Sequence, residues 1–236
     1  MENMTRVKNP NLEILALAVN QLGELADDMV FLGGCATGLL ISDPAAPPIR
    51  VTRDVDAIVQ VLSRAEYYNL SEKLREHGFK EDTSEDAPIC RWLGGEIILD
   101  VMPTNEEILG FGNIWYQKAV EHEFSVQLPD AKNIRIVSPP YFLITKLEAF
   151  KGRGNGDYTL SHDIEDIVSV LDGRPEILDE IEIADTVLVR ELANRFQELL
   201  KDQKFLDAIS GHMPTDETSQ ARVPGIIGTI NRISEL

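Results

Sequence analysis

Two aspartates interrupt an otherwise apolar, β-rich run at residues 51–62 (VTRDVDAIVQVL). Asp54 and Asp56 are two positions apart, and in a β-strand such residues project from the same face, about 6.8 Å apart along the backbone. Burying two like charges side by side is costly unless a cation or basic groups compensate them. The run therefore predicts either a cation-binding strand or an edge strand whose acidic face is solvated.

A third acid, Asp100, ends a second apolar run at residues 96–100 (EIILD). If the two runs form neighbouring strands, three carboxylates converge at one edge of a sheet. Carboxylate oxygens are the ligands that Mg²⁺ prefers, and such a cluster suits a two-metal site that acts on a nucleotide phosphate. We therefore predict that Asp54, Asp56 and Asp100 bind Mg²⁺.

A glycine pair, Gly33-Gly34, lies between a short apolar run at residues 29–32 (MVFL) and a small apolar segment at residues 35–41. This order predicts a buried strand, a tight turn and the start of a helix. Glycine permits close backbone approach, and the N–H groups at a helix N-terminus attract phosphate oxygens. A glycine pair more often forms only a turn. Here it indicates a phosphate site because an acidic strand follows it.

The remaining patterns divide the chain into two parts. Up to residue 137 they predict alternating helices and strands, including a helix capped by Ser63 and Glu66 and a hairpin that turns at Gly94-Gly95. From residue 138 onward the periodicity is helical. We expect a mixed α/β domain over residues 1–137 and a helical domain over residues 138–236 that forms the other wall of a cleft.

The composition excludes several protein classes. Asp and Glu number 40 against 22 Lys and Arg, a formal net charge of −18, which argues against a broadly basic surface that replaces counterions along nucleic acid. No apolar run approaches the ~20 residues of a membrane helix, and none resembles a signal peptide before Asn11. With only Cys35 and Cys90, a disulfide framework is excluded, and we expect a soluble cytoplasmic protein. Hydrolase-triad, P-loop, dinucleotide-binding and zinc-site spacings are absent from the sequence.

The segments at residues 30–34 (VFLGG) and 52–56 (TRDVD) together resemble the signature of the polymerase-β-like nucleotidyltransferase superfamily. The resemblance implies a mixed-sheet fold in which Gly33, Gly34, Thr52 and Arg53 bind a nucleoside triphosphate while the acids bind Mg²⁺. The chain departs from the superfamily in two ways. Nineteen residues separate Gly34 from Asp54, and Gly34 stands where many members carry a serine hydroxyl.

Within the superfamily the chain looks most similar to the AbiEii-type nucleotidyltransferase toxins of abortive-infection systems. This similarity implies that Lys146, assisted by Arg153, binds the triphosphate and that Asp163 is catalytic or orients the lysine. The residues also permit a structural interpretation. Arg153 ends a predicted helix, where a cation is favoured, and Asp163 lies in the first turn after a Ser161 cap, where an acid is favoured.

Together these features predict a Mg²⁺-dependent enzyme that moves a nucleoside monophosphate from a nucleoside triphosphate to a hydroxyl acceptor and releases pyrophosphate. Asp100 would also help to deprotonate the acceptor. The acceptor stays open among a small molecule, a protein hydroxyl and RNA, and the resemblance alone implies a toxin role with a cognate antitoxin. The alternatives are a non-catalytic nucleotide- or partner-binding protein on the same fold, and an α/β domain whose acids are solvated.

Overall fold

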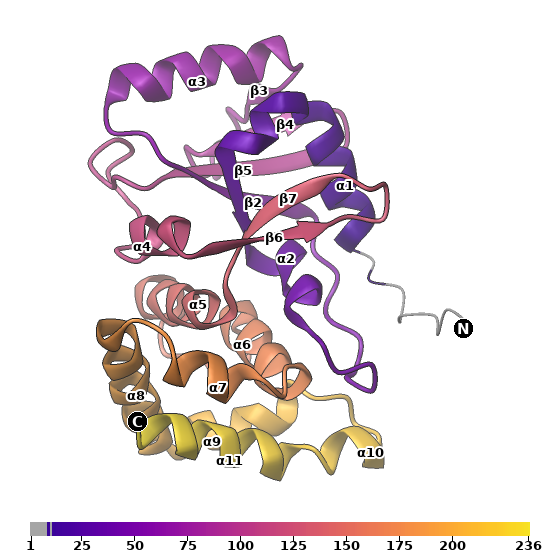
Figure 1. Cartoon of the computed structure of the whole chain (residues 1–236), viewed down its shortest axis with the longest axis vertical. Helices are drawn as coiled ribbons and strands as arrows, with labels where there is room; N and C mark the ends of the chain where they lie inside the picture. Colours follow the sequence, from indigo (N-terminus) through magenta and orange to yellow (C-terminus); the bar gives the residue numbers. More distant parts are fainter. Residues whose placement is uncertain (1–8, 10) are drawn as a thin grey trace. The chain divides into compact units, whose positions relative to one another are not determined.

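The computed structural model describes Asn9 and residues 11–236. These residues form a mixed β-sheet and a set of helices (Figure 1). Two units are distinguished. In the described part of the chain, the sheet unit comprises Asn9, residues 11–38 and Arg50–Ser138, and the helical unit comprises Leu39–Ile49 and Pro139–Leu236. The segment at residues 39–49, which contains a proline-rich loop, thus belongs to the helical unit, although it falls within residues 1–137 in the sequence.

The sheet has seven strands among the described residues, in the order β3-β4-β5-β2-β1-β7-β6 (Figure 1). Their bounds are β1 Met29–Leu32, β2 Asp54–Val59, β3 Lys80–Glu81, β4 Arg91–Gly94, β5 Ile97–Pro103, β6 Glu123–Gln127 and β7 Asn133–Val137. β2 pairs with β5, and β1 with β7, in parallel, and the other neighbours are antiparallel. The predicted mixed α/β class is confirmed.

β2 is a central strand, flanked by β5 and β1, so the edge-strand interpretation of its acids is wrong. One face of β2 carries Val55, Ala57 and Val59, which are buried. Asp54 and Asp56 alternate with them and are partly exposed on the other face. The acids therefore lie within the sheet and not at its edge, because long-range pairing adds strands on both sides of β2.

The helices of the sheet unit are α1 Asn11–Leu22, α2 Gly33–Leu40 up to Gly38, α3 Arg64–Glu76 and α4 Tyr116–Glu121, with a 3-10 segment η1 at Gly23–Asp28. α1 packs on β2 and β5 through buried residues that recur at helical spacing, among them Leu15, Val19 and Leu22. The predicted capping box at Ser63 and Glu66 is present at the start of α3. β3, β6 and α4 were not predicted because they are short and carry polar or exposed residues.

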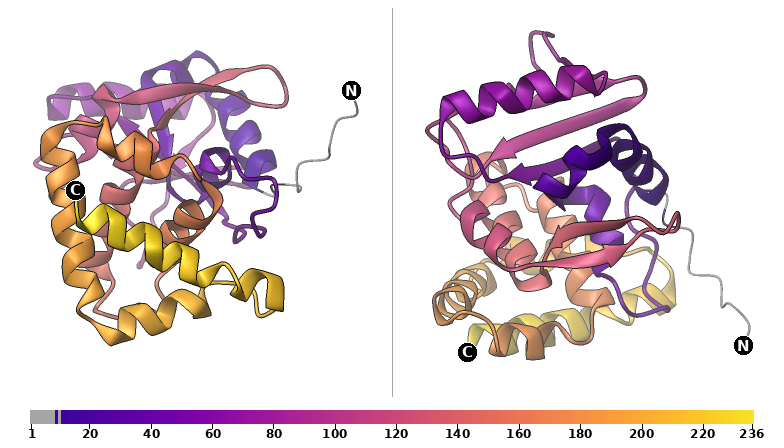
Figure 2. Two further views of the ribbon diagram at one scale, coloured as in Figure 1. Left: turned by 60° about the horizontal axis from the view of Figure 1, so that its bottom comes forward. Right: turned by 45° about the horizontal axis from the view of Figure 1, so that its top comes forward.

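The helical unit is built from amphipathic helices. Their bounds are α5 Pro139–Arg153, α6 His162–Gly173, α7 Ile177–Glu182, α8 Thr186–Leu200, α9 Gln203–Gly211, α10 Glu217–Gln220 and α11 Val223–Ser234. α8 packs against α11 (Figure 2), and buried residues three and four positions apart form their contact, including Leu192 and Phe196 on α8 and Ile226 and Ile230 on α11. No helix in the described part of the chain is both long and apolar enough to span a membrane.

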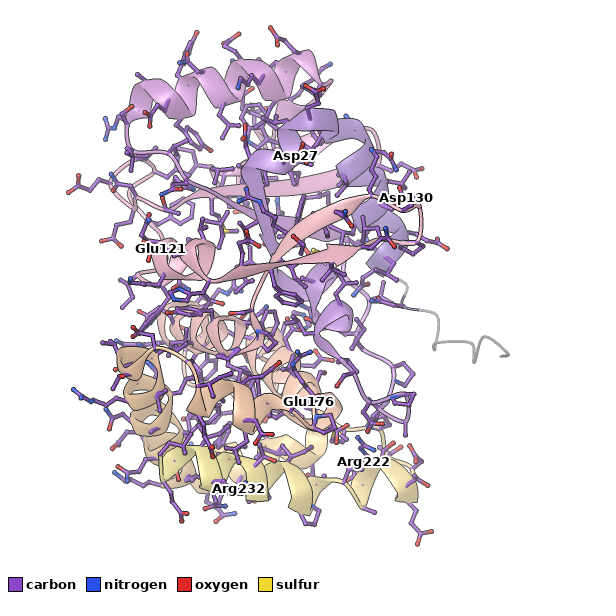
Figure 3. All side chains as sticks on the ribbon, in the orientation of Figure 1. Asp27, Glu121, Asp130, Glu176, Arg222 and Arg232 are labelled. Atoms are coloured by element: carbon purple, nitrogen blue, oxygen red, sulfur yellow. The ribbon has the colours of Figure 1, made fainter. Side chains whose placement is uncertain are left out.

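Polar contacts attach the loop at residues 41–49 to the helices of its own unit. The backbone N–H groups of Ser42 and Asp43 both donate to the Gly173 carbonyl at 2.9 Å. The Ser42 hydroxyl donates to Glu176 at 2.6 Å, and Arg222 Nη2 donates to the Asp43 carboxylate at 2.6 Å. Figure 3 labels Glu176 and Arg222 in this region. The loop is therefore part of the structure of the helical unit.

Arg222→Ala should lower the free energy of unfolding by about 2 kcal/mol, because a charged group loses its hydrogen-bond donor. Arg222 Nε donates to Asp172 at 2.7 Å, and the Asp172 side chain is only 5% exposed. Urea denaturation followed by circular dichroism measures the change. Arg232→Ala removes an exposed arginine from α11, the helix that begins directly after Arg222; it is the matched control and should change stability by less than about 0.5 kcal/mol. Equal losses in the two variants would contradict this account.

Candidate active site

Three carboxylates lie on one face of the sheet, and we refer to Asp54, Asp56 and Asp100 as the acidic face. β5 runs parallel to β2, and Asp100 pairs with Asp56 in register. Directly opposed residues on neighbouring strands project from the same face. The two predicted strands are therefore neighbours, and the three acids converge.

An arginine from the next strand occupies part of the acidic face. Arg91, at the start of β4, pairs with Asp100 in the antiparallel β4–β5 ladder. Its Nε donates to Asp100 Oδ1 at 2.8 Å and its Nη2 to Oδ2 at 2.7 Å, and Nη2 also lies 3.6 Å from Asp54 Oδ2. Hydrogen bonding to Asp100 raises the pKa of Arg91, so the guanidinium stays charged. Sequence analysis missed Arg91 because the glycine pair alone does not set the register of this hairpin.

The donor set suits a divalent cation only in part. Asp54 and Asp56 supply carboxylate oxygens, the ligands that Mg²⁺ prefers. Asp100 does not fit as the predicted third ligand in this arrangement, because both of its oxygens accept hydrogen bonds from Arg91. Accordingly, the described residues contain no group of three or more His, Cys, Asp or Glu side chains that could hold a metal ion. The acidic face thus offers a two-carboxylate site.

The glycine turn is in direct contact with the acidic strand. Gly33 has a φ of +75°, and a Cβ added there would lie 1.8 Å from Asp56 Oδ2. The β1–β2 ladder pairs the preceding residue, Leu32, with Asp56. The predicted strand and helix are confirmed as β1 and α2, and Gly33 and Gly34 form the start of α2 and not a separate turn. A Cβ added at Gly34 would lie 2.5 Å from Arg50 Nη2, so a second arginine that sequence analysis missed lies beside the turn.

A buried asparagine ties the glycine turn to the segment that leads into β2. Asn11 Nδ2 donates to the carbonyls of Gly34 at 3.1 Å and Arg50 at 3.0 Å, and its Oδ1 accepts the backbone N–H of Thr52 at 3.1 Å. The Thr52 hydroxyl in turn donates to Asp54. Asn11 is completely buried. Sequence analysis did not single it out, since a polar residue in the first turn of a helix is ordinary.

The two residues that the superfamily resemblance adds to the nucleotide site differ in their surroundings. Thr52 is buried, its backbone N–H donates to the Asn11 side chain, and its hydroxyl donates to Asp54. Arg53 is exposed. The role of both residues in binding a nucleotide stays a prediction.

The later predicted residues meet in the helical unit. Lys146 Nζ on α5 lies 3.3 Å from Asp163 Oδ1 and 2.6 Å from Asp166 Oδ2, both on α6. Arg153 donates to both oxygens of Asp163, at 2.9 and 2.8 Å. All but Arg153 are buried, and the two cations balance the two carboxylates. The arrangement accounts for the four residues structurally, and the catalytic roles that the resemblance implies for Lys146 and Asp163 stay predictions.

Two opposing effects act on the Asp163 carboxyl. Burial alone would raise the pKa of Asp163, because it disfavours the charged form. The hydrogen bonds from Arg153 and the charge of Lys146 outweigh burial, and the net result is a lowered pKa. The carboxylate therefore stays ionised in the folded protein.

Comparisons with known proteins give limited guidance. No protein-family model matches the chain, and no curated protein matches it. Among solved structures it is similar to an antigenic nucleotidyltransferase-like protein from Paracoccidioides brasiliensis, with 21% identity and a TM-score of 0.49 over 86% of this chain and 94% of that one. It is also similar to JHP933 from Helicobacter pylori, with 13% identity and a TM-score of 0.48 over 95% of this chain and 92% of that one. Similarities of this size leave the activity to be argued from the chain's own residues.

Gly33→Ala should be more destabilising than Gly95→Ala. Both glycines have a positive φ, +75° and +62°, but a Cβ at Gly95 would meet nothing within 4 Å. We expect Gly95→Ala to cost about 1 kcal/mol from backbone strain. Gly33→Ala should cost about 1–3 kcal/mol more, because its Cβ overlaps Asp56. Urea denaturation measures both variants, and indistinguishable losses would show that Asp56 moves aside freely.

The stabilising contribution of Asp163 should be lost in acid. Its pKa is lower in the folded than in the unfolded protein, so the contribution is complete above the unfolded value of about 3.9 and disappears as the pH falls through the folded value. Asp163→Asn should therefore be less stable than the wild type near neutral pH, and this difference should shrink below about pH 4. Urea denaturation over this pH range provides the measurement. Glu182→Gln removes an exposed carboxylate of the same unit and is the control, whose difference from the wild type should stay small throughout. A pH-independent difference for Asp163→Asn would contradict the lowered pKa.

Proposed function

We propose that the sheet unit binds a nucleoside triphosphate and transfers its nucleoside monophosphate to a hydroxyl acceptor with release of pyrophosphate. The contact between Gly33 and Asp56 is the observation that carries this proposal. It brings a helix N-terminus, which favours phosphate, against a pair of carboxylates, which favour Mg²⁺. A metal-bound triphosphate needs both kinds of group in one place.

The reaction would replace a phosphoanhydride bond with an ester bond at the α-phosphorus. The acceptor oxygen forms a bond to this phosphorus, the bond to the oxygen bridging the α- and β-phosphates breaks so that pyrophosphate leaves, and the proton of the acceptor hydroxyl passes to solvent. Mg²⁺, when bound, would neutralise charge on the phosphates. Asp54 and Asp56 would hold the cation, the first N–H groups of α2 would bind phosphate oxygens, and Arg50 would add positive charge beside Gly34.

Asp100 is not assigned as the base that accepts the acceptor's proton. Both of its oxygens accept hydrogen bonds from Arg91, so the hydroxyl of the acceptor would have to compete with Arg91 for them. The role of proton acceptor that we predicted for Asp100 is therefore not part of the proposal.

A second candidate is a protein that binds the nucleotide without transferring it. The Arg91–Asp100 pair favours this candidate specifically, because it removes the third acid from the metal site. The two candidates share one binding site and differ only in turnover. The identity of the acceptor, the AbiEii-type assignment, the toxin role and a cognate antitoxin rest on the sequence resemblance alone and stay predictions.

Asp54→Asn and Asp56→Asn should each weaken the binding of a nucleoside triphosphate by at least about tenfold, because each variant removes one carboxylate from the proposed cation site. Calorimetric titration with ATP, GTP, CTP and UTP, in Mg²⁺ and in EDTA, measures the effect. Wild-type binding should require Mg²⁺. Asp27→Asn removes an exposed carboxylate of the same unit (Figure 3) and should leave affinity unchanged. Binding that survives EDTA and both Asn variants would overturn both candidates.

Pyrophosphate release separates the two candidates. The bound nucleotide is incubated with a hydroxylated small molecule, with RNA or with the protein alone, and pyrophosphate is assayed. Release that disappears in Asp54→Asn supports transfer. Tight Mg²⁺-dependent binding without release under any of these conditions supports the binding protein.

A further inference from the structure

Only one edge of the Arg91 guanidinium is held by the protein. Nε and Nη2 donate to Asp100 at 2.8 and 2.7 Å. No hydrogen bond among the described residues involves Nη1. The Arg91 side chain is 25% exposed, whereas that of Asp100 is 10% exposed. The arginine is thus anchored on its buried partner and keeps donors for another group.

An anchored guanidinium suits a phosphate ligand. Its planar N–H groups match two oxygens of one anion, and a side chain already fixed by a bidentate pair loses little freedom when a second anion binds. Arg91 and Asp100 together carry no net charge, so the pair would bind an anion through the directed N–H donors of Arg91 and not through net charge. The pair therefore presents fixed donors at the acidic face.

The position of Arg91 places these donors beside the proposed cation site. Nη2 lies 3.6 Å from Asp54 Oδ2, and Asp54 shares its face of β2 with Asp56. An anion bound to Arg91 would consequently lie next to a cation bound to Asp54. In enzymes that act on nucleoside triphosphates, a phosphate group likewise contacts a divalent cation and a basic side chain at the same time.

We propose that Arg91 is a phosphate-binding residue and that Asp100 is the residue that positions it. This inference rests on the proposed function, because the anion is a phosphate group of the bound nucleoside triphosphate. It assigns Asp100 a role through Arg91 and not as a metal ligand. In the opposite assignment, the Arg91 side chain moves away from Asp100 and Asp100 binds the metal. The two assignments predict different effects on two affinities that can be measured.

The first affinity is that for ATP in Mg²⁺, measured by calorimetry. Arg91→Ala should weaken it by about tenfold or more, the size of a charge-assisted hydrogen bond. Arg91→Lys should recover only part of the loss, since an ammonium group cannot bind Asp100 in a bidentate pair and a phosphate at once. Asp100→Asn should also weaken binding, and it should cause no further loss when Arg91 is already alanine, because the two residues act as one unit.

The second affinity is that for Mn²⁺ without nucleotide, measured by electron paramagnetic resonance. Asp100→Asn should weaken it by less than about fivefold, the effect of one screened charge nearby. Arg91→Ala should leave it unchanged or strengthen it, and Asp54→Asn should weaken it by more than about tenfold. Arg64→Ala, which removes an arginine from α3 of the same unit, is the control for net charge and should change neither affinity.

Three results would overturn the inference. A loss of Mn²⁺ affinity of more than about tenfold in Asp100→Asn would identify Asp100 as a metal ligand. ATP binding that depends on Asp54 and Asp56 but is unaffected by Arg91→Ala would refute the inference and leave the proposed function intact. A wild type that binds no ATP would refute the proposed function and the inference together. If Arg91→Ala does not fold, Arg91→Lys and Asp100→Asn give the same comparison.

Discussion

The site in the sheet unit depends on a backbone approach that only glycine permits. Any side chain at position 33 would overlap Asp56, and the positive φ of Gly33 would strain it further. Because Gly33 has no Cβ, β1 can pair with β2 and end in the first turn of α2 directly against the acidic strand. The phosphate-attracting helix start and the Asp54–Asp56 pair are therefore neighbours, and the proposed chemistry follows from that proximity.

The buried acids of each unit lie beside positive charge. In the sheet unit, Arg91 holds Asp100, and in the helical unit Lys146 and Arg153 hold Asp163 and Asp166. Burying a carboxylate without a cation or hydrogen-bond donors is too costly for a fold of ordinary stability. In a chain with a net charge of −18, the positions of these few cations therefore determine which carboxylates can be buried and which face water.

Local features of this protein were determined by the sequence alone. The Ser63–Glu66 capping box, the strand and helix that meet at Gly33 and the shared face of Asp54 and Asp56 all involve residues no more than a few positions apart. Backbone geometry within one helix or strand decides such relations, so periodicity and spacing are sufficient to predict them. The division into an α/β part and a helical part follows from the same periodicities.

The partners of the acids were decided only by the tertiary structure. Strand order made β2 central and placed β5 beside it, and the register of the β4–β5 hairpin put Arg91 opposite Asp100. The reach of Asn11 to Arg50 and Thr52 likewise depends on how α1 packs. A shift of one residue in register would turn every side chain of a strand to the other face, and the burial of the whole sheet selects the register. The register therefore depends on many contacts between residues that are distant in sequence, and no local sequence pattern contains this information.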